Sequence, residues 1–378
     1  MTIAAPAYSP GLEGVIAGES AISRIDLERN RLIIRGYDLV ELTENAAYEE
    51  LAYLLLHDDL PNRSQFDAFD AQLKAERPLP GAVLDLLRQA PAATHPMTLL
   101  RTVVSLLAFY DPEAEDNSHA ANVRKTVRLL AKIPTAITAG QRLAAGREPV
   151  EPHPDLGQAA NLLYMLRGEP AAVYEVEAMN ISLILYAEHG YNASAFAARV
   201  TASTLSNLHA AITTGIGTLA GPLHGGANEA AMEMLLEVGG KDQAEAWVLD
   251  ALAKKKKIMG FGHREYKNGD SRVPSMKAVG RDIAEATGDS AWVETADIIE
   301  ATMDREKGIF PNVDFPCAYT YYMMGIPIPL YTPIFVSSRV AGWAAHIIEQ
   351  LENNRLIRPN HIYTGSEEKP LKPLAERG

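Results

Sequence analysis

The chain has 378 residues, 47% of them hydrophobic and 22% charged, which is the composition of a globular protein of two or three domains. Its 48 acidic and 35 basic residues give a net charge of −13, which disfavours nucleic acid and anionic membranes as partners. The single cysteine, Cys317, excludes an internal disulfide framework and a cysteine-based structural zinc site, and fits a reducing, cytoplasmic location.

The first residues and the apolar runs of the chain predict neither a signal peptide nor a membrane helix. The first ten residues lack the basic and apolar regions of a signal peptide, and no apolar run reaches the roughly 18 residues of a membrane helix. We therefore expect a soluble protein.

A helical period dominates the chain. In residues 45–57 the apolar side chains recur every three or four positions, which predicts an amphipathic helix that ends before Pro61. Further helices are predicted over 81–89, 97–110, 118–145 with a kink at Pro134, 157–167, 173–187, 194–220, 227–238, 242–256, 275–287, 290–306, 316–324 and 333–352. Strand signals are sparse: 31–35 is a short candidate that pairs with 20–25 in a hairpin. The prediction is an all-α, multihelical fold.

The first stretch with chemical interest is Gly-Pro-Leu-His-Gly-Gly-Ala-Asn-Glu at 221–229, in a corner between two predicted helices. A histidine near a helix N-terminus is favoured in its neutral form, because the positive end of the helix dipole opposes protonation. Neutral His224 can therefore donate a hydrogen bond to a carbonyl that becomes an enol. The alternative is a corner histidine bonded to the backbone.

The second stretch is Gly-Phe-Gly-His-Arg-Glu-Tyr-Lys-Asn-Gly-Asp-Ser-Arg at 260–272. Its glycines permit close backbone approach to a ligand, and its basic residues suit an anion that carries carboxylates or phosphates. The four lysines before it, Lys254 to Lys257, are typical of a solvated helix end. The alternative for the whole stretch is an exposed basic turn.

The third stretch is Pro-Asn-Val-Asp-Phe-Pro-Cys at 311–317. Asp314 lies between apolar residues just before a predicted helix. It is either a helix N-cap or a partly desolvated carboxylate that acts as a base.

Together, and in this order, these stretches resemble the citrate synthase family. The resemblance covers almost the whole chain and includes Gly-Leu-Glu-Gly-Val at 11–15, Arg-Gly-Tyr-Asp at 35–38, His-Pro-Met at 95–97, Ala-Glu-His-Gly-Tyr-Asn-Ala-Ser at 187–194, Arg-Pro at 358–359 and Tyr-Thr-Gly at 363–365. It implies an all-α fold with a large domain, 1–221 plus 328–378, a small domain, 222–327, and the active site in the cleft between them.

The resemblance implies three catalytic residues. Asp314 would remove a proton from the methyl group of acetyl-CoA, His224 would hold the thioester oxygen as the enol forms, and His263 would polarise the ketone of oxaloacetate. A carboxylate with a reference pKa of about 3.9 is far too weak to remove this proton alone, so the developing charge must be stabilised by donors. Citrate and CoA would be the products, with no metal and no resident cofactor.

The resemblance also implies the binding residues. Oxaloacetate would be bound by His189, Arg272, Arg339 and Arg358, the last contributed by the partner subunit of a homodimer. Coenzyme A would be bound by Lys257, Ile258, Gly260, Phe261, Gly262 and Lys267. Because the chain begins close to its Gly11 stretch, we expect the short form of the family, without the N-terminal segment linked to hexamers and NADH inhibition.

Two alternatives remain at this point. A 2-methylcitrate synthase would use propionyl-CoA with the same catalytic groups, and the difference of one methylene is worth only about 1–3 kcal/mol. A non-catalytic CoA-binding or scaffold protein would be expected to have lost at least one of the three catalytic residues.

The sequence departs from the family pattern beside the site. Ser271 replaces a usual proline before Arg272, which predicts a looser turn, and Pro316-Cys317 follows Asp314-Phe315 where a Tyr- or Ser-Gly-type sequence is common. Both changes concern substrate range and rate more than reaction type.

Overall fold

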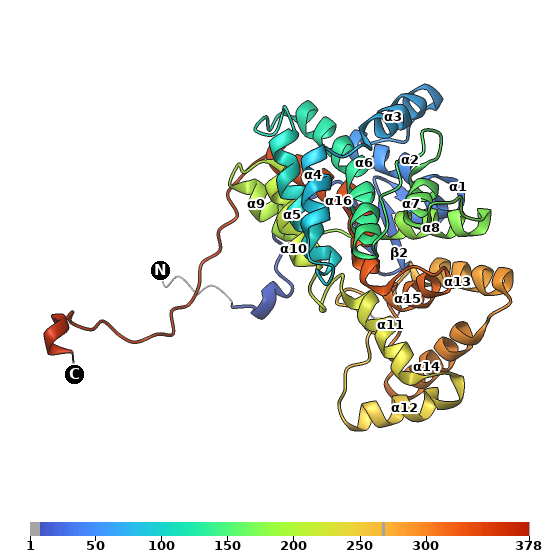
Figure 1. The fold of residues 1–378 in the computed structure, drawn as a ribbon. Helices are drawn as coiled ribbons and strands as arrows, with labels where there is room; N and C mark the ends of the chain where they lie inside the picture. The colour runs from blue at the N-terminus through green and yellow to red at the C-terminus, as the bar shows by residue number, and fades with distance from the viewer. Residues whose placement is uncertain (1–7, 267–268, 378) are drawn as a thin grey trace.

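The computed structural model describes residues 8–266 and 269–377. The strands are β1 (Ser23–Asp26), β2 (Arg31–Ile34) and β3 (Tyr37–Asp38). The helices are α1 (Leu39–Asn45), α2 (Tyr48–His57), α3 (Arg63–Glu76), α4 (Gly81–Gln89), α5 (Pro96–Leu107), α6 (His119–Ala144), α7 (Gln158–Arg167), α8 (Val173–Tyr186), α9 (Ala193–Ser203), α10 (Leu208–Leu219), α11 (Ala227–Val238), α12 (Lys241–Ala253), α13 (Val273–Thr287), α14 (Ala291–Lys307), α15 (Asp314–Met323) and α16 (Tyr331–Glu352). The all-α prediction is confirmed (Figure 1).

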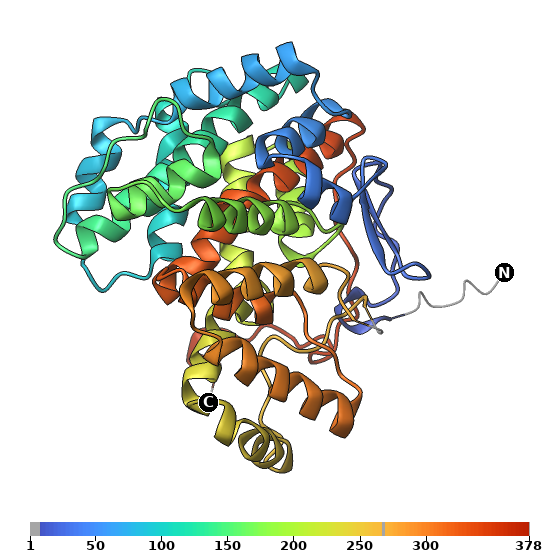
Figure 2. The ribbon, with the colours of Figure 1, turned by 90° about the vertical axis from the view of Figure 1, so that its right-hand side faces the viewer.

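Helix α16 is the centre of the fold. Every residue from Tyr331 to Ile348 is buried, and the helix packs against α2, α5, α6, α8, α9 and α10. Figure 2 shows it running through the middle of the helical body. Gly215 of α10 faces the ring of Trp343, where a Cβ would lie 3.0 Å from the indole, so the missing side chain lets α10 approach α16 closely.

The three strands near the N-terminal end of the described residues form a small antiparallel sheet in the order β1-β2-β3. Ser23 pairs with Ile34 and Asp26 with Arg31, so the predicted hairpin is confirmed, although β1 begins later than expected. Leu32 and Ile34 of β2 point into the core and attach the hairpin to the helices.

Three features differ from the predicted helices. The predicted helix 194–220 is wrong: the chain breaks between α9 and α10, where Leu205 has a φ of 66° and Asn207 caps the start of α10. Helices α1 and α3 were not predicted; α3 buries only Phe69 and Leu73, so its apolar pattern is faint.

Proline 134 lies inside α6 without ending it. A proline has no N–H, so the carbonyl four residues earlier, that of Leu130, loses its usual donor. The side-chain amide of Gln158 replaces it, donating to the Leu130 oxygen at 2.9 Å. Arg77 in turn donates to the Gln158 amide oxygen.

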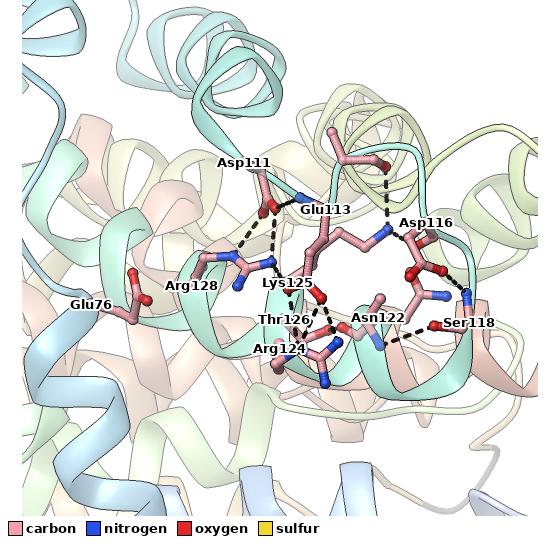
Figure 3. Close-up of polar contacts among 12 residues, drawn as sticks. Glu76, Asp111, Glu113, Asp116, Ser118, Asn122, Arg124, Lys125, Thr126 and Arg128 are labelled. Atoms are coloured by element: carbon pink, nitrogen blue, oxygen red, sulfur yellow. Dashed lines mark hydrogen bonds and ion pairs between the residues drawn. The ribbon is translucent and has the colours of Figure 1, made fainter.

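A network of charged side chains fixes the loop that precedes α6 (Figure 3). Buried Lys125 donates to the backbone oxygen of Asp116 at 2.6 Å, and Arg128 pairs with Asp111 at 2.8 Å. Arg124 and Arg128 both bind Glu113 and lower the pKa of that carboxyl to about 2. These bonds satisfy the network internally, so its role is to hold the loop against α6.

Helices α11 to α15 lie together below the rest of the molecule in Figure 1. Within this group α11 and α13 pack on α15, and α12 packs on α14, while α13 also contacts α8. Across the described ranges, no helix has the length and apolar character needed to cross a membrane.

Candidate active site

His224 lies in the turn between α10 and α11. Its N–H donates to the carbonyl of Gly221 at 2.9 Å, and a side chain at Gly225 would collide with Leu219, so the turn requires glycine. On the ring, Nε2 accepts the backbone N–H of Ser194 at 3.3 Å, which places the ring proton on Nδ1.

Burial, first of all, and then the positive charges of Arg339 and Arg272 together lower the pKa of His224 to about 3. The imidazole is therefore neutral at working pH, as predicted. The position before a helix N-terminus predicts this neutrality from the helix dipole, whereas in the structure its main causes are burial and then two arginines.

His263 and His189 face each other. Their ring centroids are 5.1 Å apart, and Nδ1 of His263 accepts the backbone N–H groups of Glu265 and Tyr266, which places the ring proton of His263 on Nε2. His189 is buried, and in the part of the chain that is described its Nε2 has no hydrogen-bond partner. Burial, then Arg272 and His263, hold the pKa of His189 well below its usual range. An unpartnered buried nitrogen of this kind is suited to a polar ligand.

Asp314 is the first residue of α15, and the N-cap position belongs to Val313. Its carboxylate accepts a hydrogen bond from the hydroxyl of Tyr186 at 2.8 Å. Burial raises the pKa of Asp314 to about 6, against the opposing effects of that hydrogen bond and of Arg272. The base interpretation therefore has support that the N-cap interpretation lacks.

Two of the predicted arginines are buried beside these groups. Arg272 forms a bidentate pair with Asp270, at 2.9 Å and 2.7 Å, which raises the pKa of Arg272 although burial opposes this. Arg339 donates from Nε to the backbone oxygen of Tyr186 at 2.6 Å and lies over the ring of Phe335. Burial lowers the pKa of Arg339 to about 10.

The turn around Ser271 is not left loose by the missing proline. The Asp270 carboxylate also accepts the backbone N–H of Arg272 at 3.0 Å, and the hydroxyl of Ser271 lies 3.0 Å from that of Tyr266. A proline at position 271 would still allow the bond from the Arg272 N–H, but it could not make the hydroxyl contact with Tyr266, so Ser271 adds one hydrogen bond to the turn.

Backbone bonds join the His263 loop to the start of α15. Gly262 donates to the oxygen of Phe310, and Asn312 donates to the oxygen of Gly260 through its N–H and to that of Gly262 through its side chain. The side-chain oxygen of Asn312 then accepts the N–H of Asp314 at 3.1 Å. Asn312 thus fixes Asp314 relative to the His263 loop.

The predicted coenzyme A residues follow α12. Ile258 and Phe261 are buried, Lys257 is exposed, and the rings of Phe261 and Phe315 are 4.7 Å apart. Lys267 lies outside the described residues. In the lysine run, Lys254 pairs with Asp250 and Lys256 with Glu237, as expected for a solvated helix end.

Arg358 lies apart from these groups. It is exposed in the C-terminal segment that leaves the helical body in Figure 1, and its guanidinium contacts Asn360 at 3.3 Å. Among the described residues of this chain, no hydrogen bond or ion pair joins Arg358 to the site.

The structure brings together six of the predicted residues: His189, His224, His263, Arg272, Asp314 and Arg339. Arg272 and Arg339 both act electrostatically on His189, His224 and Asp314, and the rings of His263 and His189 meet edge to face. It adds residues that the sequence analysis did not assign. Tyr186 immediately precedes the stretch 187–194, and Ser194 is the last residue of that stretch. Asp270 lies two residues before Arg272, and Asn312 lies two residues before Asp314. The only sequence signal for these four residues is that they lie within or next to one of the stretches quoted above.

A metal centre is not apparent. Within 8–266 and 269–377, no three His, Cys, Asp or Glu side chains are grouped so that they could hold an ion. A cavity of about 710 Å³ between α4, α5 and α6 is lined by none of the predicted site residues.

The helical fold holds a buried carboxylate together with neutral histidines and two buried arginines, an arrangement suited to removing a proton from carbon and stabilising the charge that develops. The family model described as "Citrate synthase, C-terminal domain" matches residues 11–360. The chain belongs to the citrate synthase family.

Relatives and solved structures agree with this assignment. The chain is 47% identical to citrate synthase 2 of Bacillus subtilis, with 97% of this chain and 98% of the relative covered. It is 43% identical to 2-methylcitrate synthase of Mycobacterium tuberculosis, with 97% and 93% covered. A solved ternary complex of citrate synthase from Thermoplasma acidophilum with carboxymethyl coenzyme A and oxaloacetate is similar at a TM-score of 0.92 and 31% identity, covering 98% of this chain and 100% of that one.

Proposed function

We propose that this chain condenses acetyl-CoA with oxaloacetate and water to give citrate and CoA, as citrate synthases do. The observation that carries the proposal is Asp314. Its carboxylate is buried with a pKa raised to about 6, and it shares the electrostatic environment of neutral His224 and two buried arginines. A base whose pKa is close to working pH can accept a proton effectively while remaining ionised.

Each step of the carbon–carbon bond formation has a residue suited to it, and water then hydrolyses the resulting citryl thioester to release citrate and CoA. Asp314 removes the methyl proton, and Nδ1–H of His224 stabilises the oxygen of the forming enol. Nε2–H of His263 donates to the ketone oxygen of oxaloacetate as the carbon–carbon bond forms. His189, Arg272 and Arg339 bind the dicarboxylate, because bidentate guanidinium contacts fix its orientation. The thioester enters as a substrate, and the reaction as proposed uses no resident cofactor or metal.

The proposal extends to assembly. We place the small domain at 222–327 and expect its closure to exclude water. We also expect a cytoplasmic homodimer in which Arg358 reaches the partner's site. What supports the dimer is the C-terminal segment, which exposes Leu356, Ile362 and Tyr363 outside the helical body.

A 2-methylcitrate synthase is the second candidate, supported by the relative from Mycobacterium tuberculosis at 43% identity. Thiol release from acetyl-CoA and from propionyl-CoA, each with and without oxaloacetate, decides between the two. A preference of about tenfold in kcat/KM, worth about 1.4 kcal/mol, is enough to assign the substrate. Cys317 is fully buried, so its background with a thiol reagent should be small in the folded enzyme.

The assignment of the base is tested with Asp314→Asn. The variant should bind oxaloacetate in calorimetry and lose turnover by about 100-fold or more. Near-full turnover would remove Asp314 from its role. No thiol release by the wild type with either acyl-CoA would favour the non-catalytic alternative instead.

A further inference from the structure

Tyr186, the last residue of α8, contacts the proposed base directly. Its hydroxyl donates to Oδ1 of Asp314 at 2.8 Å, and its ring lies 4.0 Å from that of Phe335, measured between centroids. The side chain is 1% exposed, so solvent does not compete for the hydroxyl. The proposed mechanism leaves this residue without a role.

The same residue also holds one of the arginines. The backbone oxygen of Tyr186 accepts a hydrogen bond from Nε–H of Arg339, with an N···O distance of 2.6 Å. The Arg339 guanidinium also lies over the ring of Phe335, against which the Tyr186 ring packs. Tyr186 therefore connects the base, through its side chain, to a proposed substrate-binding arginine, through its backbone.

Other buried polar side chains lie near the hydroxyl of Tyr186 and the proposed base. Cys317, one turn along α15 from Asp314, is fully buried, and the hydroxyl of buried Tyr321 bonds that of Ser182. Burial, first of all, and then the charge of Asp314 hold the pKa of Tyr186 well above its usual range. The phenol consequently stays protonated and acts as a donor toward the carboxylate.

We propose that Tyr186 is a positioning residue for the proton-abstracting step: its hydroxyl occupies Oδ1 of Asp314 and leaves Oδ2 to accept the carbon-bound proton. This inference rests on the proposed function. In the step, the C–H bond of the acyl methyl group breaks, its proton forms a bond to Oδ2, and its electron pair becomes the enolate. Tyr186 keeps its own proton throughout and favours the ionised carboxylate by hydrogen bonding to it.

Tyr186→Phe removes the hydroxyl and little else. We expect kcat to fall by about 10- to 100-fold, because the base is no longer held in one orientation, while KM for oxaloacetate stays within about twofold. The acid limb of kcat/KM, which should lie near the pKa of Asp314, is expected to move upward by about half a pH unit or more, since a bond to the charged form is lost. A purely structural tyrosine would not move that limb.

Tyr321→Phe is the matched control. Tyr321 is equally buried, and its hydroxyl contacts that of Ser182 rather than the base. Its pH profile should match that of the wild type. If Tyr186→Phe has the kcat and acid limb of Tyr321→Phe, the proposal is overturned.

A second variant covers the case in which Tyr186→Phe does not fold. Site-specific 3-fluorotyrosine at position 186 keeps the ring and the hydroxyl but makes the phenol a stronger donor. The acid limb should then move to lower pH, and an unmoved limb contradicts the proposal. Both experiments use wild-type condensation as the reference, so an inactive wild type refutes the proposed function, whereas an active wild type with unaffected variants refutes only the role of Tyr186.

Discussion

The hydroxyl oxygen of Ser194 lies 2.7 Å from Nε2 of His224, and the indole N–H of Trp343 donates to that same oxygen at 3.0 Å. The backbone N–H of Ser194 also points at Nε2. The central helix α16 therefore orients His224, the histidine proposed to stabilise the enol, through a serine at the start of α9. This arrangement selects the tautomer that carries its proton on Nδ1.

Ser194→Ala should lower kcat by about tenfold, because one of the two contacts that orient His224 remains. Loss of the acceptor for Trp343 adds a stability cost of about 1–3 kcal/mol. Ser338→Ala is the matched control, since Ser338 is as buried but bonds the backbone oxygen of Leu183. Steady-state kinetics and urea unfolding measure both effects. Equal kcat in the two variants would show that Ser194 does not orient His224.

Asp314→Asn should be more stable than the wild type at pH 8. The folded-state pKa of Asp314 is raised, to about 6, so the folded state holds this proton more tightly than the unfolded chain does. Wild-type stability from this group is present below the unfolded pKa and is lost as pH rises toward 6. The neutral asparagine avoids that loss, which is up to about 3 kcal/mol.

Urea unfolding at several pH values checks this prediction. The gap between variant and wild type should open between about pH 4 and pH 6 and stay constant above that range. A wild type that is the more stable protein at pH 8 would mean that the buried carboxylate is compensated by neighbours.

Gly260→Ala should disturb the base from a distance. Gly260 has a φ of +77°, and a Cβ there would lie 2.7 Å from Cβ and 3.0 Å from Cα of Phe315, the residue after Asp314. Gly288→Ala is the control, with a φ of +71° and nothing within 4 Å of the added carbon. The control should cost about 1–2 kcal/mol and keep its activity. Gly260→Ala should cost more and lose turnover, measured by thiol release per folded molecule.

Asp270→Asn leaves buried Arg272 without its counter-charge. Removing one partner of a buried ion pair typically costs about 3–5 kcal/mol. Because Asp270 also orients Arg272, we expect KM for oxaloacetate to rise. Glu148→Gln, which breaks the exposed pair with Arg88, should leave both the unfolding midpoint and KM unchanged. An unchanged midpoint in Asp270→Asn would indicate that solvent reaches Arg272.

The sequence predicted helices best where apolar periodicity and Gly or Pro punctuation agree, as in α4 and α11. The break between α9 and α10 has neither glycine nor proline; it depends on a left-handed Leu205 and on the Asn207 cap. In the sequence, the only sign of such a break is a polar capping residue, here Asn207, within an otherwise apolar segment. Helix α3 was not predicted because only Phe69 and Leu73 are buried, and two apolar residues are too few to show a helical period.

The site divides in a similar way. His224, His263 and Asp314 stand in glycine- or proline-rich stretches whose composition is unusual for helix surface, so the sequence indicates them as candidates. Tyr186 and Ser194 occupy ordinary helical positions, and their contacts arise only when α8, α9 and α16 pack together. The order of residues in one sequence does not show which helices pack against one another.

The Gln158 amide that replaces the missing donor at Pro134 gives a last prediction. Gln158→Met keeps the side-chain length but leaves the Leu130 oxygen and the Arg77 guanidinium with one partner fewer. We expect a loss of about 2–4 kcal/mol in stability with unchanged turnover per folded molecule, because these residues are not among those of the site. In a Pro134→Ala background, the new backbone N–H can donate to Leu130, so the cost of Gln158→Met should fall by about 1 kcal/mol. Urea unfolding of the four proteins gives this coupling directly. A coupling of zero would show that Gln158 stabilises the fold through Arg77 alone.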